Sequence, residues 1–245
     1  MKILSVTTAT NHLSVALNDG LTVISEKNEE DQRNHSEHLD PMIAEILREN
    51  DLALADIDRF AVAIGPGSYT GLRIGITTIK MFGSILNKEV VGISTLAALA
   101  KGAKNDGLII TALDARNDNY FAGGYFKQGE KLTEVIPDGH YHLDRLIEVI
   151  KTYIDEQKLE VITVVGTGVQ DKAEVFADLP VTVSFGSQSE NEIHAGFIGK
   201  LAMNEVPVDP DVLLPRYLRR TQAEVDWHKR TGKPFGQDSD YVEEV

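Results

Sequence analysis

The order of predicted secondary-structure elements occurs twice along this chain, and that repeat limits the possible folds more than any other feature of the sequence. Alternating or continuous apolar runs predict strands, and apolar residues with a helical period predict helices. In the first half the patterns are strands at 2–6, 13–17 and 22–27, a helix at 36–50, a strand at 59–64, a helix at 70–86, a strand at 89–92 and a helix at 94–101. In the second half they are strands at 108–113, 120–127 and 131–136, a helix at 143–156, a strand at 161–165, a helix at 169–177, a strand at 181–185 and a helix at 192–204. Both halves have the order β-β-β-α-β-α-β-α, which predicts a duplicated α/β fold of two lobes with a cleft between them.

The boundaries of the predicted lobes follow from the linker between them. The segment GAKNDG at 102–107 has the glycines and polar residues of a domain boundary, so we predict a first lobe at 1–103 and a second at 104–215. Residues 216–245 then form a helix at 216–227 and a polar tail whose composition is typical of disorder. Two unrelated α/β domains are the alternative to a duplication.

The chain is acidic and lacks cysteine. Its 245 residues include 38 acidic and 24 basic side chains, for a formal net charge of −14. The lack of cysteine excludes disulfides and thiolate metal sites and fits a reducing compartment. No apolar run approaches the roughly 20 residues of a membrane helix or resembles a secretory signal. We therefore expect a soluble, cytoplasmic protein that does not contact membranes.

The densest basic group lies near the C-terminus, at Arg216, Arg219 and Arg220, with Lys229 and Arg230 further on. The acidic charge elsewhere repels a phosphate backbone. The group is either a solvated helix face or a small nucleic-acid contact, and we favour the solvated face. Unaided RNA binding is therefore not expected.

The first hairpin lacks an acid that its predicted fold usually has. The repeated element order is that of the actin, Hsp70 and sugar-kinase fold, so the predicted fold class is actin-like (ASKHA, ribonuclease H-like). In that fold the hairpin after strand one holds nucleotide phosphates, and an Asp at the end of the strand organises the metal ion and the attacking water. Here the sequence VTTAT supplies hydroxyls but no carboxylate for Mg²⁺, and Thr7 stands where the Asp is expected. We do not expect ATP hydrolysis from this loop.

The matching loop of the second lobe keeps an acid. Asp114 ends a predicted strand, but Ala115 and Arg116 crowd a turn where close approach of a phosphate usually requires glycine. A local ion pair or turn hydrogen bond between Asp114 and Arg116 is the simpler interpretation, and weak nucleotide binding is the alternative. The candidate members of a vestigial nucleotide site are Thr7, Asp114, Gly166 and Gly168.

A glycine-rich segment, GPGSYTGLRIG at 65–75, joins a predicted buried strand to a helix. Backbone amides at such a junction can cradle an anion. The segment is neither a Walker A loop nor a dinucleotide-binding loop, because it lacks Gly-Lys-Ser/Thr and has Thr70 at the third glycine position. A tight turn whose Ser68 or Thr70 caps the helix is an equal alternative.

The helix at 70–86 has two apolar stripes. At 100° per residue, one face carries Leu72, Ile76, Ile79, Gly83 and Leu86. A second stripe, about 140° away, carries Ile74, Met81 and Ile85. A surface helix needs only one apolar face, so the second stripe either packs on a neighbouring helix of the same lobe or contacts another subunit.

Two histidines near the start of the helix at 36–50 invite a metal hypothesis. His35 and His38 are three residues apart, and no third ligand is evident nearby. A helix start with Leu39, Ile43 and Ile46 facing inward explains the segment more simply. We expect no metal site.

These segments together resemble a known family. MKILSVTTATNHLSVAL, HSEHLDPMI, GPGSYTGLRIG, ISTLAALA, LDARNDNYF and PRYLRRTQAE are similar to the TsaB (YeaZ) family, over the chain up to about Glu224, and GPGSYTGLRIG is the most specific of them. The resemblance implies the actin-like fold and a role in making threonylcarbamoyladenosine in tRNA. It also implies a lack of catalytic power in this subunit alone, so we expect no catalytic residues and no cofactor in this chain.

The resemblance also implies partners. Family members pair with a related catalytic subunit, TsaD, through helices of the first lobe, and a small ATPase, TsaE, joins them. Contact with tRNA is expected only through that complex. The two apolar stripes of the helix at 70–86 separately leave two states of the free chain open, a homodimer and a monomer. The segments that match the pairing helices give the candidate interface residues Leu39, Ile43, Tyr69, Leu72, Arg73 and Ile76.

Two departures separate this chain from catalytic relatives. The family usually has an Asp in the first loop, where this chain has Thr7. The catalytic relative has two His four residues apart, whereas the position four after His35 is Leu39. The main prediction is thus a non-catalytic partner subunit. The alternatives are an actin-like ATPase or kinase and, less favoured, a metallo-glycoprotease.

Overall fold

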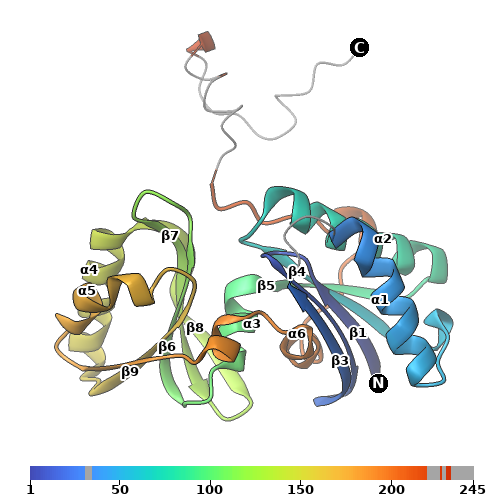
Figure 1. The fold of residues 1–245 in the computed structure, drawn as a ribbon, viewed down its shortest axis with the longest axis horizontal. Coiled ribbons are helices and arrows are strands. Elements are labelled where there is room, and N and C mark those ends of the chain that lie inside the picture. Colours follow the sequence, from blue (N-terminus) through green and yellow to red (C-terminus); the bar gives the residue numbers. More distant parts are fainter. Residues whose placement is uncertain (31–34, 220–226, 228–229, 233–245) are drawn as a thin grey trace.

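The computed structural model describes residues 1–30, 35–219, 227 and 230–232 and shows an α/β protein with two lobes. Each lobe contains one mixed five-stranded sheet covered by helices (Figure 1). The N-terminus lies in the first lobe, which is blue to teal in Figure 1, and the second lobe is green to orange. The predicted fold class is confirmed.

The first sheet has the strand order β3-β2-β1-β4-β5. Its strands are β1 (Lys2–Thr7), β2 (His12–Asp19), β3 (Thr22–Glu30), β4 (Arg59–Gly65) and β5 (Glu89–Ser94). The first three strands form an antiparallel meander, and β4 and β5 run parallel to β1. Parallel strands need long crossovers, which here are the helices between them.

The second sheet repeats this arrangement in the order β10-β9-β6-β7-β8. Its strands are β6 (Gly107–Asp114), β7 (Asn119–Gln128), β8 (Lys131–His142), β9 (Val161–Gly166) and β10 (Thr182–Phe185). Since β6 takes the place of β1 and β9 that of β4, the two sheets have the same topology. The predicted duplication is therefore confirmed.

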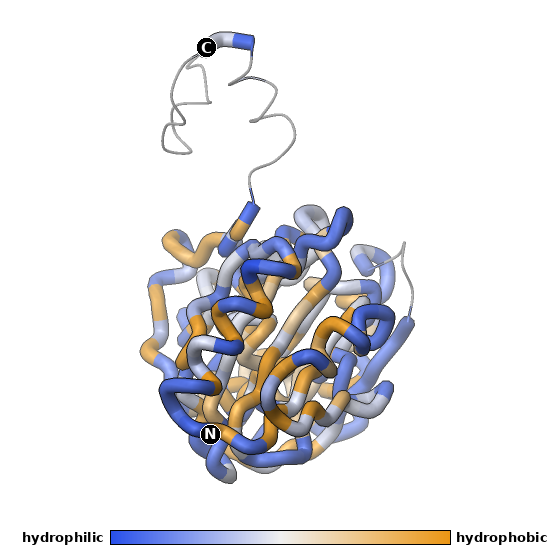
Figure 2. The backbone as a smooth tube through the Cα atoms, turned by 90° about the vertical axis from the view of Figure 1, so that its left-hand side faces the viewer, coloured by the Kyte–Doolittle hydropathy of each residue, from blue (hydrophilic) through white to orange (hydrophobic). Residues whose placement is uncertain are grey.

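The outer helices cover the outer face of each sheet. They are α1 (His35–Glu49) and α2 (Tyr69–Leu86) in the first lobe, and α4 (Leu143–Gln157) and α5 (Ala173–Ala177) in the second. Short 3-10 helices lie at Leu54–Asp56, Gln170–Lys172, Gln188–Asn191 and Pro210–Val212. Hydrophobic stretches follow the strands and inner helix faces, whereas hydrophilic stretches mark the turns (Figure 2).

The last helix of each repeat crosses to the other lobe. Helix α3 (Thr95–Gly102) packs on strands of the second sheet, and α6 (Ala195–Ala202) packs on all strands of the first. The two helices also contact each other, so they form a layer between the sheets. The Ser94 side chain caps α3 by accepting a hydrogen bond from the Ala97 amide.

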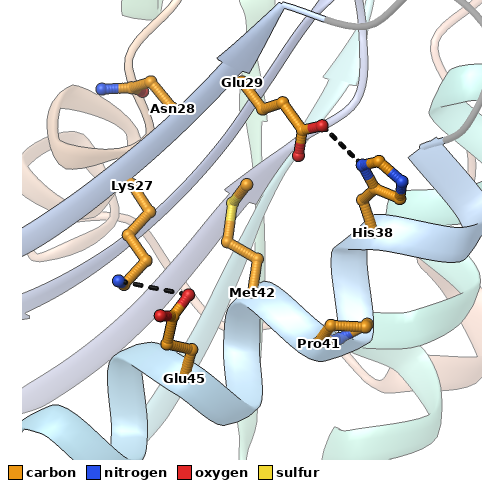
Figure 3. A pocket seen from close by; sticks show the side chains of 7 residues that line it. All are labelled: Lys27, Asn28, Glu29, His38, Pro41, Met42 and Glu45. Carbon is orange, nitrogen blue, oxygen red and sulfur yellow. Dashed lines mark hydrogen bonds and ion pairs between the residues drawn. The ribbon is translucent and has the colours of Figure 1, made fainter.

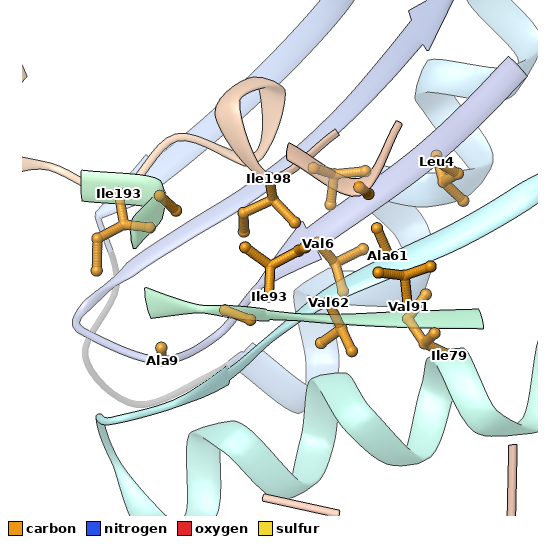
Figure 4. Close-up of a cluster of buried hydrophobic side chains, with 14 of the residues drawn as sticks. Leu4, Val6, Ala9, Ala61, Val62, Ile79, Val91, Ile93, Ile193 and Ile198 are labelled. Carbon is orange, nitrogen blue, oxygen red and sulfur yellow. The ribbon is translucent and has the colours of Figure 1, made fainter. Parts of the chain in front are cut away.

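The hydrophobic core is continuous through this central layer. Ile198 of α6 lies close to Val6 of the first sheet, and Ile79 of α2 approaches Val62 and Val91 from the other face (Figure 4). The same cluster includes Ile109, Leu113, Tyr125 and Val165 of the second sheet. Alternate residues of β6 face the core under α4 instead, as the twofold period of a strand requires.

Residues 206–219 form a segment, here called the C-terminal strap, that returns over the first lobe. The Val208 amide bonds to the Val90 carbonyl, and Leu213 is buried against Gly92. The division at 103/104 as a domain boundary stays a prediction, but residues assigned there to the second lobe (195–215) pack against the first sheet.

The predicted helix at 216–227 is wrong at its start. Residues 216–219 are not helical, because the Arg216 amide bonds to the Ile64 carbonyl at 2.7 Å instead of entering a helical turn. Residues 220–226 of that prediction, and the predicted polar tail from 233 onward, lie outside the described residues.

Candidate partner-binding surface and nucleotide-site remnants

Helix α2 lies directly on the first sheet because glycines remove bulk on its inner face. Its N-cap is Ser68, whose hydroxyl accepts a hydrogen bond from the Gly71 amide at 3.2 Å. A Cβ at Gly71 would overlap the Thr8 carbonyl oxygen, and one at Gly75 would lie 2.6 Å from the Thr8 hydroxyl oxygen. The GPGSYTG junction is thus a capped helix start packed on the β1–β2 turn.

Four of the predicted interface residues lie in the core. Leu39 and Leu72 are 1% exposed, and Ile43 and Ile76 are 3% exposed. Their side chains pack under α1 and α2 in the first-lobe core, so they present nothing to a partner. The prediction is corrected on these four, because the more apolar face of each helix covers its own sheet.

The second stripe of α2 stays on the surface. Met81 is 45% exposed and Ile85 is 74% exposed, while Ile74 is partly buried against the core. Helices α1 and α2 contact each other, but that contact leaves Met81 and Ile85 open to solvent. The alternative in which a neighbouring helix of the same lobe covers the stripe does not hold for these two residues.

The other two predicted interface residues, Tyr69 and Arg73, are exposed and form one cluster with Tyr217 of the strap. The Tyr69 and Tyr217 rings stack with centroids 4.7 Å apart. The Arg73 guanidinium donates hydrogen bonds to the Tyr69 hydroxyl at 2.5 Å and the Tyr217 hydroxyl at 3.0 Å, and lies 4.3 Å from the Tyr69 ring centroid. No local sequence pattern indicated Tyr217, which is 144 residues from Arg73.

Exposed apolar side chains are concentrated on the two elements that form this cluster, α2 and the strap. Among the described residues, twelve large apolar side chains are well exposed, and eight of them lie on α2 or the strap. These eight are Tyr69, Met81, Ile85, Val206, Val208, Val212, Leu214 and Tyr217. Such a gathering marks an interaction surface more often than single exposed residues do.

A buried carboxylate ties the strap to the second lobe. The Asp138 side chain has no exposed surface and accepts hydrogen bonds from the Tyr125 hydroxyl at 2.5 Å and the Ser94 hydroxyl at 2.6 Å. The Arg216 guanidinium reaches the same carboxylate at 3.1 Å. Burial raises the pKa of the Asp138 carboxyl, although these hydrogen bonds and the charge of Arg216 oppose the rise.

In the first lobe, the protein's own groups occupy the vestigial nucleotide site. Thr7 is buried, and its hydroxyl accepts a hydrogen bond from the Ala9 amide at 3.3 Å. The Thr8 hydroxyl donates to the Gly71 carbonyl at 2.6 Å, and the Ser68 amide donates to the Ala9 carbonyl at 2.6 Å. The glycine-rich junction therefore closes onto the hairpin where the fold would hold phosphates.

The vestigial nucleotide site of the second lobe brings together three of the four predicted residues. Asp114, Gly166 and Gly168 lie at or just after the ends of β6 and β9. A Cβ at Gly168 would lie 3.1 Å from the Asp114 Cβ, and one at Gly166 would overlap the backbone of Ala112. Thr7 lies in the other lobe. The Asp114 carboxylate accepts a hydrogen bond from the Arg116 amide at 2.7 Å, which is the predicted turn hydrogen bond.

The two histidines of α1 have structural partners. The His35 Nε2 lies 2.8 Å from the Thr10 carbonyl oxygen, and the His38 Nδ1 lies 2.5 Å from Glu29. Both contacts attach the start of α1 to the first sheet. Over residues 1–30 and 35–219 and the few described beyond them, no group of three His, Asp or Glu side chains is placed to hold a metal ion.

A pocket of about 580 Å³ lies between β3 and α1 (Figure 3). Lys27 pairs with Glu45 at 3.2 Å across it, and Glu29 pairs with His38 at the other end. Met42 and Pro41 form its apolar part. Its charged groups already pair with each other, so it shows no binding chemistry of its own. Within the described part of the chain, no helix has the length and apolar character needed to cross a membrane.

The comparisons with known proteins agree with this architecture. The model of the TsaD family, described as tRNA N6-adenosine threonylcarbamoyltransferase, matches residues 22–227. The chain is 31% identical over 229 residues to the tRNA threonylcarbamoyladenosine biosynthesis protein TsaB of Bacillus subtilis, covering 93% of this chain and 98% of that protein. It is 33% identical to the TsaB of Escherichia coli, covering 69% of this chain and 73% of that one.

A solved structure is also similar. YeaZ from Pseudomonas aeruginosa superimposes with a TM-score of 0.70 at 25% identity, covering 88% of this chain and all of that one. The sequence matches and the shared fold lead to one conclusion. This chain belongs to the TsaB (YeaZ) family of tRNA threonylcarbamoyladenosine biosynthesis proteins.

Proposed function

We propose that this chain is a partner subunit without catalytic activity of its own, which binds and activates a TsaD-type catalytic relative in the synthesis of threonylcarbamoyladenosine in tRNA. The observation that carries the proposal is the exposed surface of α2, where Tyr69 and Arg73 lie on the same helix as Met81 and Ile85. A helix that already buries one apolar face on its own sheet has no fold-related need for a second.

The residue types on this surface support protein binding. Tyrosine, arginine and methionine are enriched at protein interfaces, and tyrosine and arginine dominate binding hot spots. The stacked Tyr69 and Tyr217 rings hold Arg73 in one place, so little side-chain entropy is lost when a partner binds.

The family match supports the identity of the partner. The TsaD model covers residues 22–227, so a TsaD-type protein shares this fold and has a counterpart of α2. Two related chains that pair through equivalent helices make a pseudo-symmetric dimer, the commonest arrangement among protein oligomers. The same surface accounts for a homodimer in the absence of the partner.

The nucleotide remnants support the lack of activity. The first-lobe hairpin has no carboxylate, and its hydroxyls bond to the neighbouring junction. Asp114 of the second lobe bonds to its own turn. In this proposal a TsaE-type ATPase supplies nucleotide hydrolysis, tRNA is contacted only through the complex, and the complex acts in the cytoplasm.

The test measures association with a TsaD-type protein from the same organism. We expect the two purified proteins to form a stable complex, and Met81→Glu with Ile85→Glu to weaken it at least tenfold, because two charges would enter an apolar interface. Val161→Glu is the matched control. Val161 is also apolar and 53% exposed, but it lies on β9 of the second lobe.

Two results would contradict the proposal. One is unchanged association by the double variant, provided that thermal unfolding shows both proteins folded. The other is steady ATP turnover by the purified chain that disappears in Asp114→Asn, which would indicate an actin-like ATPase instead.

A further inference from the structure

We propose that the C-terminal strap is the second half of the partner-binding surface, and that the second lobe holds it in place through Asp138. The inference rests on the proposed function and names the TsaD-type relative as the occupant. It assigns a binding role to a segment outside the helices that the sequence predicts for pairing.

The strap runs along α2 in the opposite direction. Pro210 packs at Gly83 near the end of the helix, and the Asp211 carbonyl accepts a hydrogen bond from the Lys80 ammonium at 3.1 Å. At the start of the helix, Tyr217 stacks on Tyr69. Contacts at both ends of α2 make the helix and the strap adjacent parts of one surface.

The strap directs apolar side chains outward. Leu213 is 5% exposed, whereas its neighbours Val212 and Leu214 are both 65% exposed. Val212 ends the 3-10 helix of the strap and Leu214 follows the buried Leu213, so the strap covers its own core with one apolar side chain and leaves two others exposed for a partner.

Three anchors fix the end of the strap. The Arg216 amide bonds to the Ile64 carbonyl of the first lobe at 2.7 Å, and its guanidinium bonds to the buried Asp138 of β8. The Arg219 guanidinium donates to the Ala115 carbonyl of the second lobe at 3.3 Å. Tyr217 lies between these anchors, so the position of the second lobe sets the position of its ring.

Charge and continuity favour a protein related to this chain as the occupant. The strap meets the exposed side of α2 at Lys80 and at the Tyr69–Arg73–Tyr217 cluster, so a partner that covers this cluster also reaches the strap. Arg73 and Arg219 donate to hydroxyl and carbonyl oxygens in a chain of net charge −14, so both guanidinium groups can still bind a partner carboxylate.

The experiment compares two surfaces on the full chain. Dissociation constants for the TsaD-type protein are measured for Val212→Glu with Leu214→Glu in the strap, for Met81→Glu with Ile85→Glu in α2, and for Val161→Glu as the control. We expect at least a tenfold weakening for the strap variant and for the α2 variant, and none for the control. The strap positions are exposed, so the melting temperature of the free chain should not change.

The outcomes separate the two proposals. Normal binding by the strap variant, with weak binding by the α2 variant, would overturn the inference and leave the proposed function intact. Normal binding by both would overturn the proposed function. A strap variant that disrupts only self-association of the free chain in sedimentation would make a second copy the occupant and also overturn the inference.

The anchor is tested separately by Arg216→Gln, which keeps a polar side chain but loses the charge that meets Asp138. We expect a three- to tenfold weakening of partner binding, with most of the change in the association rate, because the strap must be ordered at each encounter. Binding equal to that of the unaltered chain would show that Asp138 does not position the strap.

Discussion

The Arg73 guanidinium hydrogen-bonds to two tyrosine hydroxyls, one on its own helix and one on the strap. For single residues of α2, the burial of the side chain decides whether it stabilises the fold or is available for binding. Leu72 is adjacent to Arg73 in sequence but is 1% exposed, and its methyl groups belong to the first-lobe core. Adjacent helical residues point about 100° apart, so one can serve stability and the next binding.

This difference in burial predicts that two apolar substitutions on α2 change the free energy of unfolding by very different amounts. Leu72→Ala should lower the free energy of unfolding by about 2–5 kcal/mol, because it leaves a cavity in the core. Ile85→Ser should change it by no more than about 0.5 kcal/mol, because Ile85 is 74% exposed. Urea denaturation of both variants measures these changes. A large loss for Ile85→Ser would place that side chain in the core.

Residue-level prediction from sequence succeeded where the period of a helix was enough. The two stripes of α2 were assigned correctly, and so was the turn hydrogen bond at Asp114. The interface candidates taken from the family's pairing segments were less accurate, since Leu72 and Ile76 belong to the stripe that packs on the sheet. Asp138 and Tyr217 gave no local signal, because their partners are far away in the sequence.

At the scale of elements, α2 depends on glycines that a free helix would not favour. Gly71 and Gly75 lie inside the helix, where glycine costs up to about 1 kcal/mol relative to alanine. They are used here because the Thr8 backbone and hydroxyl occupy the space of a Cβ. Because α2 lies so close to the β1–β2 turn, no space is left for phosphates at the vestigial nucleotide site of the first lobe.

The expected effect of Gly71→Ala is therefore the reverse of the usual one. Alanine normally stabilises a helix, but here its methyl group would overlap the Thr8 carbonyl oxygen, so we expect a loss of about 1–3 kcal/mol. Thr77→Ala, at an exposed position of the same helix, is the control and should be neutral or slightly stabilising. Chemical denaturation of the two variants measures both effects. A more stable Gly71→Ala variant would mean that the turn can move away.

Element prediction was accurate wherever the apolar period was strong, and the exceptions have tertiary causes. Strand β8 was expected to end at Ile136, but it continues through Pro137 to His142. A proline is tolerated there because β8 is an edge strand and its ladder with β7 is irregular at that point. The predicted helix from 216 was not formed at its start because Arg216 bonds to the first lobe.

At the scale of the whole molecule, polar contacts between sequence-distant residues fix the crossing helices. Arg59 of β4 is buried and caps the end of α6 by donating to the carbonyls of Ala202, Met203 and Glu205. At the start of α6, His194 lies 3.5 Å from Glu26 of β3. The hydrogen bond with Glu26 raises the pKa of His194, although burial opposes the rise.

The His194–Glu26 pair predicts a pH dependence of stability. A raised histidine pKa means that the folded state binds the proton more tightly, so the stabilisation is complete below the unfolded pKa of about 6.5 and is lost as the pH rises through the folded pKa. We expect the free energy of unfolding to decrease as the pH rises above about 6.5, and His194→Gln to reduce this slope. Denaturation at several pH values measures it. An identical slope in the variant would assign the dependence to other groups.

The crossing of α3 and α6 also has a consequence for how the protein is made. Much of the inner face of the first sheet stays uncovered until Ile198 and its neighbours have left the ribosome, because α6, which packs on all five strands, comes late in the chain. A nascent chain that stops before residue 195 therefore carries a sheet whose inner apolar face is largely open to water, with only α3 to cover part of it. Premature termination should yield products that chaperones retain or proteases remove, and the cell gets a folded lobe only from a nearly complete chain.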